Sequence, residues 1–142
     1  MAGEVIVGYD GQDGAVAALR TATGIAAAFD RPLVIVFGYR PAAIGGEVAD
    51  LATAVRDLGA RMGDEALARV AEIDATVAAS VELVDDRPAE ALLRAGDEHD
   101  ALAIVVGTAG RGPIAGSLLG SVTYQVVHRA NRPVVVVPPP EA

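Results

Sequence analysis

Short apolar runs alternate along the chain with longer segments in which apolar residues recur at helical spacing. Five runs rich in Val, Ile and Leu, each bounded by Gly, Pro or Asp, are typical of β-strands: residues 5–7, 33–37, 81–84, 101–106 and 134–137. The segments between them carry apolar residues three or four positions apart, as amphipathic helices do. This alternation predicts an α/β fold, an open parallel sheet with helices on both faces and right-handed crossovers.

The strand runs differ in ways that predict their places in the sheet. Residues 5–7 and 101–106 are continuously apolar, which predicts inner strands buried on both faces. Glu82 interrupts the third run, which predicts an edge strand. In such sheets a ligand binds beyond the carboxyl ends of the strands, where the winding reverses. We therefore expect the loops after the first and fourth runs to form the two sides of one crevice.

The first two predicted helices carry clear apolar faces. In the first helix this face consists of Val16, Leu19, Thr23 and Ala26. The second helix extends over residues 48–73 and contains Gly59 and Gly63. Each of these glycines costs about 1 kcal/mol relative to Ala in a helix interior. A close approach of the helix to the sheet would explain them.

The third and fourth predicted helices are defined by their end signals. Pro88 suits the first turn of the third helix, and Asp86 precedes it. The fourth helix begins at Gly120 or Ser121 and ends before Asn131 and Pro133. Its inward face is predicted to consist of Val122, Val126 and Val127.

Length and composition favour one soluble, cytoplasmic domain spanning residues 1–142. No uninterrupted apolar stretch reaches the roughly 18 residues of a membrane span, and the first residues lack the basic region of a signal peptide. The chain has no cysteine, which excludes disulfides, thiolate catalysis and cysteine-ligated zinc.

The charged residues narrow the chemistry further. A net charge of −8 argues against a nucleic-acid or anionic-membrane surface. All eleven basic residues are arginine, so the chain has no P-loop lysine and no Schiff-base lysine. His99 and His128 lie in helical segments without metal-ligand spacing, and we expect structural roles for both. The groups that remain to bind a ligand or carry out chemistry are carboxylates, hydroxyls, arginines and backbone groups.

The glycine-rich segment 107–121 is the strongest functional signal. It holds five glycines in fifteen residues, after a predicted strand and before a predicted helix. Glycine lets backbone N–H groups approach an anion, and the helix that follows adds its free N–H groups and dipole. Gly107 and Gly112 have P-loop spacing, but no lysine follows them. The segment therefore predicts nucleotide binding by backbone amides.

The spacing Gly107-x2-Gly110-x9-Gly120-Ser121 resembles the ATP-binding signature of the universal stress protein family. Residues 8–11 (Gly-Tyr-Asp-Gly), 88–93 and 132–137 are similar to this family as well, so the resemblance covers essentially the whole chain. It implies a single Rossmann-like domain with strand order 3-2-1-4-5 and ATP lying across the ends of strands one and four.

The resemblance also implies roles for individual residues. Asp10 and the backbone at Gly38 would meet adenine and ribose, and Gly107 and Gly110 would approach the ribose and phosphates. The β- and γ-phosphates would be held by Gly120, Ser121 and Val122.

Several side chains keep a second interpretation. Asp10 could instead cap the first helix or its turn, and Ser121 could be only an N-cap. Arg111 either neutralises phosphate charge or lies in solvent. Tyr9 and Tyr39 either flank the adenine or pack in the core.

The function implied is a nucleotide-dependent regulatory module of the stress response, with magnesium as a possible partner of the phosphates. Dimerisation through Val134–Val137 would cover an apolar strand edge. The alternative is a slow ATPase or nucleotide phosphotransferase in which Asp10 or Asp13 orients water and a metal ion.

Overall fold

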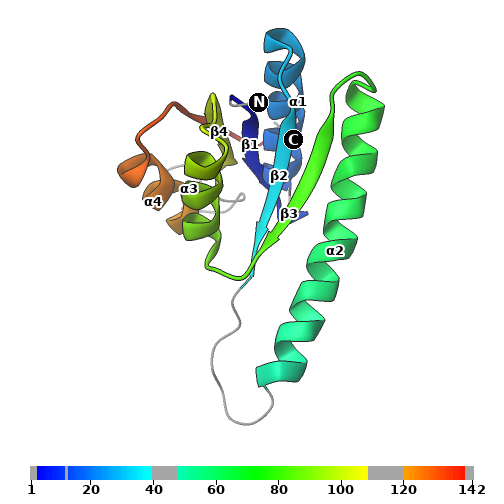
Figure 1. The fold of residues 1–142 in the computed structure, drawn as a ribbon, viewed down its shortest axis with the longest axis vertical. Coiled ribbons are helices and arrows are strands. Elements are labelled where there is room, and N and C mark those ends of the chain that lie inside the picture. Colours follow the sequence, from blue (N-terminus) through cyan, green and yellow to red (C-terminus); the bar gives the residue numbers. More distant parts are fainter. Residues whose placement is uncertain (1–2, 12, 40–47, 109–119, 140–142) are drawn as a thin grey trace.

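Strands and helices alternate along the described chain as the apolar pattern predicts. The computed structural model describes residues 3–11, 13–39, 48–108 and 120–139. The elements follow one another as β1 (Val5–Gly8), α1 (Asp13–Phe29), β2 (Leu33–Gly38), α2 (Val48–Ile73), β3 (Ala79–Val84), α3 (Pro88–Glu98), β4 (Ala103–Gly107), α4 (Ser121–Arg129) and β5 (Val134–Val137) (Figure 1).

The strands form one parallel sheet with the order β3-β2-β1-β4-β5. This order is the one that the family resemblance implies. β1 and β4 are direct neighbours, with Val5 opposite Ala103 and Val7 opposite Val105. The inner positions predicted for these two strands and the edge position predicted for the strand with Glu82 are therefore confirmed.

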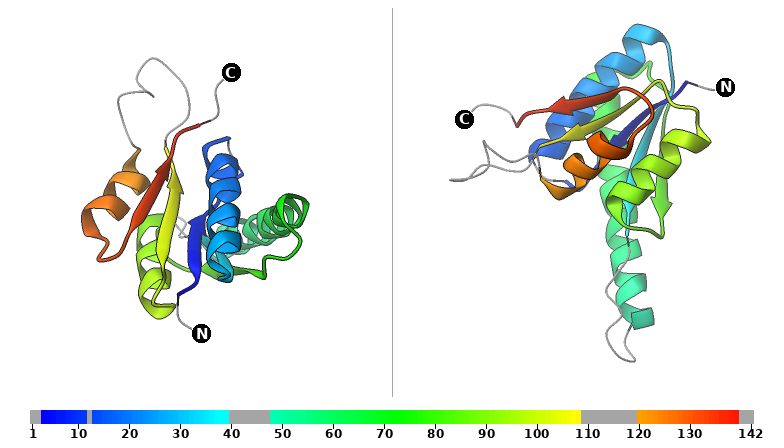
Figure 2. Two further views of the ribbon diagram at one scale, coloured as in Figure 1. Left: turned by 90° about the horizontal axis from the view of Figure 1, so that it is seen from above. Right: turned by 90° about the vertical axis from the view of Figure 1, so that its left-hand side faces the viewer.

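Helices cover both faces of the sheet, α1 and α2 on one and α3 and α4 on the other (Figure 2). Side chains alternate between the faces of a strand. Val5 and Val7 therefore point into the core with α1 and α2, whereas Ile6 points into the core with α3 and α4. The continuous apolar run of β1 follows from burial on both sides.

The glycines of α2 let this helix lie close to the sheet. A Cβ atom at Gly63 would lie 2.8 Å from Cγ1 of Val81, and one at Gly59 would collide with the ring of Phe37. The close approach predicted for these two positions is confirmed.

None of the helices within the described residues has both the length and the apolar character needed to cross a membrane.

The inward face of α4 differs from the prediction in one residue. Val126 is buried and Val122 is half-buried, but Val127 is 42% exposed. Thr123 is buried instead, with 4% of its surface exposed. Successive residues of a helix are about 100° apart around its axis. The side chains of 122, 123 and 126 therefore point to one side of α4, and Val127 points about 90° away from the middle of that side. The hydrophobicity of Val127 thus misled the prediction.

His99 links the end of α3 to the segment before β1 and to β3. It caps the end of α3, its Nδ1 lies 3.0 Å from Oε2 of Glu4, and its Nε2 lies 2.7 Å from Oε2 of Glu82. Burial alone would lower the pKa of His99, but the hydrogen bond and charge of Glu82, with those of Glu4, outweigh burial and raise it. His128 is exposed on α4, and its ring stacks on that of Tyr124.

The raised pKa of His99 predicts a pH-dependent stability. Because the folded-state pKa lies above the usual 6.5, the stabilisation is fully present below that pH and is lost as the pH rises through the folded-state pKa. We expect urea unfolding at about pH 6 and about pH 8.5 to show a stability advantage of wild type over His99→Gln that shrinks at the higher pH. The exposed His128→Gln variant is the control. An advantage that does not change with pH would contradict the assignment.

The close approach of α2 predicts opposite effects of the same substitution at two helical glycines. A Cβ atom at Gly24 in α1 meets nothing within 4 Å, so Gly24→Ala is expected to stabilise the protein by about 0.5–1 kcal/mol through helix propensity. Gly63→Ala gains the same helix propensity, but the added methyl group overlaps the stiff side chain of Val81. We therefore expect a net loss of about 1–3 kcal/mol in the free energy of unfolding. Equal effects in thermal unfolding would show that α2 does not lie this close to β3.

Candidate functional site

A cavity of about 500 Å³ opens at the carboxyl edge of the sheet. The ends of β1, β2 and β4 form its floor, the first turns of α1, α3 and α4 form its sides, and Pro139 after β5 contributes to its wall. The cavity lies where the winding of the sheet reverses: β2 and β3 lie on one side of β1, and the chain then crosses back to place β4 and β5 on the other side. The crevice predicted between the loops after the first and fourth strands is thus confirmed for the described residues of these loops, which are 9–10 after β1 and 108 after β4.

The predicted site residues are partly brought together by this cavity. Asp10, Gly38, Gly107 and Val122 line it. Gly120 and Ser121 precede Val122 at the start of α4. Gly110 and Arg111 lie outside the described residues.

Helix starts converge on the cavity. Asp13 and Gly14 of α1, Pro88 of α3, and Val122 and Thr123 of α4 all line it. The first N–H groups of a helix have no partner within the helix and carry the positive end of its dipole. Sequence reasoning used only the helix after the glycine-rich loop. Every helix that follows a parallel strand begins at this edge of the sheet. The predicted topology could therefore also have indicated that the start of α1 lines the cavity.

Gly120 is needed for the backbone that leads into α4. It is the N-cap residue and has a φ of 84°, a conformation that side chains of L-residues rarely adopt. The interpretation of Ser121 as the N-cap is therefore wrong, because Ser121 is the first residue of the helix. Its side chain is exposed.

Gly107 and Gly38 are also needed for packing. A Cβ atom at Gly107 would collide with the carbonyl oxygen of Gly14, and a Cβ atom at Gly14 would lie 2.6 Å from the carbonyl oxygen of Thr108. A Cβ atom at Gly38 would lie 2.8 Å from Cα of Pro88. The first turns of α1 and α3 thus lie directly against strand ends, which explains both glycines independently of any ligand.

Thr123 is a site residue that sequence reasoning missed. Its hydroxyl donates a hydrogen bond of 2.6 Å to the carbonyl oxygen of Gly107 and thereby ties the first turn of α4 to the end of β4. A threonine in the first turn of a helix has many possible partners, so its sequence position alone could not reveal this one.

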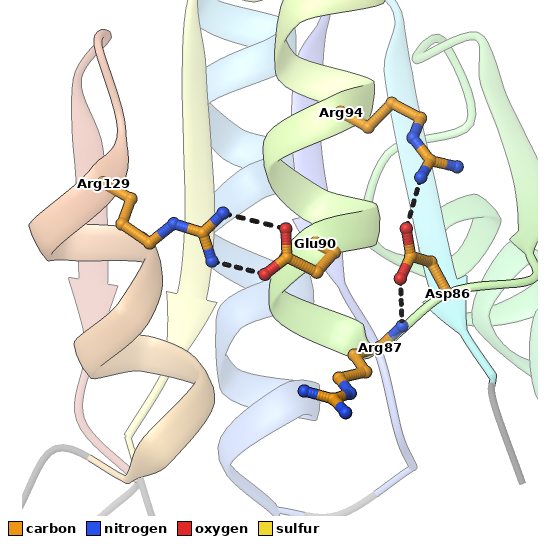
Figure 3. A network of polar contacts seen from close by, with 5 residues as sticks. All are labelled: Asp86, Arg87, Glu90, Arg94 and Arg129. Carbon is orange, nitrogen blue, oxygen red and sulfur yellow. Dashed lines mark hydrogen bonds and ion pairs between the residues drawn. The ribbon is translucent and has the colours of Figure 1, made fainter.

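A polar network holds the wall formed by α3 (Figure 3). Buried Asp86 accepts a hydrogen bond of 2.8 Å from the backbone N–H of Arg87 and pairs with Arg94. Glu90 accepts two hydrogen bonds from the guanidinium group of Arg129 on α4, which lowers the pKa of Glu90. These contacts fix the start of α3 and join α3 to α4 beside the cavity.

The two strand-end tyrosines pack toward α2. Tyr9 is 5% exposed, and its hydroxyl donates a hydrogen bond of 3.1 Å to Oε1 of Glu65. Tyr39 is 9% exposed, and its hydroxyl accepts a hydrogen bond of 2.7 Å from Arg56. Core packing is confirmed for both rings, and Tyr9 additionally lines the cavity. Burial, followed by the hydrogen bond and charge of Glu65, raises the pKa of Tyr9.

The charged side chains among the described lining residues are carboxylates, those of Asp10 and Asp13. Within the described part of the chain, no group of three or more His, Asp or Glu side chains is arranged to hold a metal ion. In this part of the cavity, the groups that can attract an anion are therefore backbone amides and the positive ends of helix dipoles.

Comparisons with known proteins agree with this architecture. The model of the "Universal stress protein family" matches residues 1–138. Universal stress protein Rv1636 of Mycobacterium tuberculosis is 34% identical over 141 residues, which cover 94% of each chain. A solved universal stress protein in complex with cAMP is 31% identical, with a TM-score of 0.75 and coverage of 99% of this chain and 100% of that one.

A more distant structure shares the fold alone. The universal stress protein from Archaeoglobus fulgidus in complex with dAMP is 21% identical, with a TM-score of 0.71 and coverage of 95% of this chain and 97% of that one. The family model and the sequence identity of the nearer relatives lead to one conclusion: the chain belongs to the universal stress protein family.

Proposed function

We propose that this protein binds ATP in the cavity at the carboxyl edge of the sheet and acts as a nucleotide-dependent regulatory module in the stress response. The observation that carries the proposal is the convergence of α1 and α4 on this cavity, with Gly120 in the left-handed conformation before α4. A family member of 31% identity was solved in complex with cAMP, which supports an adenine nucleotide as the ligand.

The proposed pose assigns the phosphates to the α4 side. Gly120, Ser121 and Val122 would present N–H groups and the Ser121 hydroxyl to the β- and γ-phosphates, and Gly107 and Gly110 would lie against the ribose and α-phosphate. Arg111 would neutralise part of the charge. The support is the start of α4 at Ser121, where free N–H groups point out of the helix.

The adenosine would occupy the side nearer to β2. Val36, Leu92 and Val106 offer apolar walls to the base, and Gly38 offers its backbone. Asp10 is exposed at the end of β1, where its carboxylate can accept hydrogen bonds from ribose hydroxyls.

The two lining carboxylates favour a nucleotide that arrives with magnesium. Asp10 and Asp13 would repel a bare triphosphate, and the net charge of −8 adds to this repulsion. Magnesium is commonly bound by one or two carboxylates together with substrate phosphates. The same two carboxylates are the observation that favours slow ATP hydrolysis as a second candidate function, and phosphate release on incubation with Mg-ATP would distinguish it from binding alone.

Calorimetric titration with Mg-ATP tests the proposed site. We expect wild type to bind, and Gly120→Ala to bind about 10- to 100-fold more weakly, because an alanine there moves the amides of α4 away from the phosphates. Ser121→Ala, which leaves the backbone unchanged, is expected to lose about tenfold or less.

Gly24→Ala is the matched control, because it adds the same methyl group where nothing lies within 4 Å. Wild-type affinity in both Gly120→Ala and Ser121→Ala would refute the phosphate assignment. No heat or saturation of wild type with any adenine nucleotide, with or without magnesium, would refute the function.

We further propose a homodimer formed through β5. The four valines Val134–Val137 are only half-buried, and β5 forms the outer edge of the sheet. The carbonyl oxygens of Pro133 and Val137 accept hydrogen bonds from the N–H groups of Ile104 in β4 and of Thr108 just after it. By alternation, the backbone polar groups of Val134 and Val136 therefore point outward. A second copy could pair with them and cover the valines.

Sedimentation at micromolar concentration is expected to show a dimer for wild type. Val136→Pro removes an outward N–H group without breaking the pairing of β4 with β5, and we expect this variant to sediment as a folded monomer. A wild-type monomer, or an unchanged dimer in Val136→Pro, would refute the proposed interface.

A further inference from the structure

The turn that contains Asp10 lies next to helix α2. Tyr9 and Gly11 flank Asp10 in the sequence, and both lie close to α2. The hydroxyl of Tyr9 donates to Oε1 of Glu65 at 3.1 Å. A Cβ atom at Gly11 would lie 3.7 Å from Cε of Met62, one helical turn before Glu65. Tyr9 is therefore hydrogen-bonded to α2, and Gly11 lies close to the preceding turn of the same helix.

The Glu65 carboxylate is itself held in place. Nε of Arg69 donates to the same Oε1 at 3.1 Å, so two donors from different elements converge on one oxygen atom. The side chains of Glu65 and Arg69 are 48% and 44% exposed, and an exposed pair at this helical spacing contributes little to stability. The hydrogen bond to Tyr9 is different, because its donor belongs to a residue that is 95% buried and lines the cavity.

We propose that Glu65, acting through the Tyr9 hydroxyl, is a positioning residue that sets the orientation of Asp10 and thereby the ability of the site to discriminate ribose from 2′-deoxyribose. This inference rests on the proposed function, in which Asp10 faces the ribose.

The chemistry of the pair suits this role. A hydroxyl that donates to a carboxylate forms a charge-assisted hydrogen bond, which is stronger than a bond of the same geometry between neutral groups. Burial and Glu65 raise the pKa of Tyr9, so the hydroxyl remains a donor throughout the neutral pH range. A site that hydrogen-bonds a substrate hydroxyl rejects the analogue that lacks it, because the polar group of the site is then left without a partner.

Tyr39 provides a matched comparison within the same molecule. Its ring is similarly buried at the end of the neighbouring strand β2, and its hydroxyl also bonds to a charged residue of α2, Arg56. Tyr39 is not among the described lining residues of the cavity. Removal of either hydroxyl costs a comparable hydrogen bond, but only the loss at Tyr9 is expected to reach Asp10 and thereby the ribose.

The test is calorimetric titration with ATP and with 2′-deoxyadenosine triphosphate, both as magnesium complexes. Wild type is expected to bind ATP more tightly. In Tyr9→Phe and Glu65→Ala, we expect ATP affinity to fall about three- to tenfold and the ratio of the two dissociation constants to approach one. Glu65→Gln keeps an oxygen acceptor and is expected to retain much of the ratio, whereas Tyr39→Phe keeps all of it.

The ratio separates a positioning role from a merely structural one, because general destabilisation weakens both nucleotides alike. Glu65 lies on the surface, so its variants keep the test open if Tyr9→Phe does not fold. Equal wild-type affinities, or an unchanged ratio in Glu65→Ala, would overturn this inference and leave the proposed function intact. A wild type that binds neither nucleotide would overturn the proposed function and this inference with it.

Discussion

The cavity depends on the contacts made around Gly107 at the end of β4. On one face of the sheet the first turn of α1 lies against it so closely that neither Gly107 nor Gly14 has room for a Cβ atom. On the other face the buried hydroxyl of Thr123 binds its carbonyl oxygen and fastens α4. Because protein interiors are close-packed, these two contacts fix where both helices begin. The convergence of their N-termini is thus a result of packing at one residue.

This arrangement suits anion binding in an acidic chain without lysine. Helix starts offer N–H groups and a positive dipole end whose position is set by the backbone, so they need no flexible cationic side chain. Among the described lining residues the charges are those of Asp10 and Asp13. They oppose a bare phosphate chain, so the proposed site would favour an anion whose charge is partly neutralised.

A second layer of contacts supports the edge of the sheet. Helix α2 approaches the sheet closely through Gly59 and Gly63, and its charged residues bind the hydroxyls of Tyr9 and Tyr39 at the ends of β1 and β2. On the other face, Asp86 fixes the start of α3. The strand ends that line the cavity are therefore held by tertiary contacts on both faces of the sheet.

The sequence by itself determined the alternation of strands and helices, the inner and edge strands, and the position of the cavity. The reason is that burial on one or both faces of an element requires apolar residues at regular spacing along the sequence. It also indicated which glycines matter. Only the tertiary structure decided why they matter, since the collision at Gly107 involves Gly14, which lies far away in the sequence. The buried hydroxyl of Thr123, the exposure of Val127 and the partners of Tyr9 were likewise decided by which elements meet in space, and no local pattern encodes a contact between distant segments.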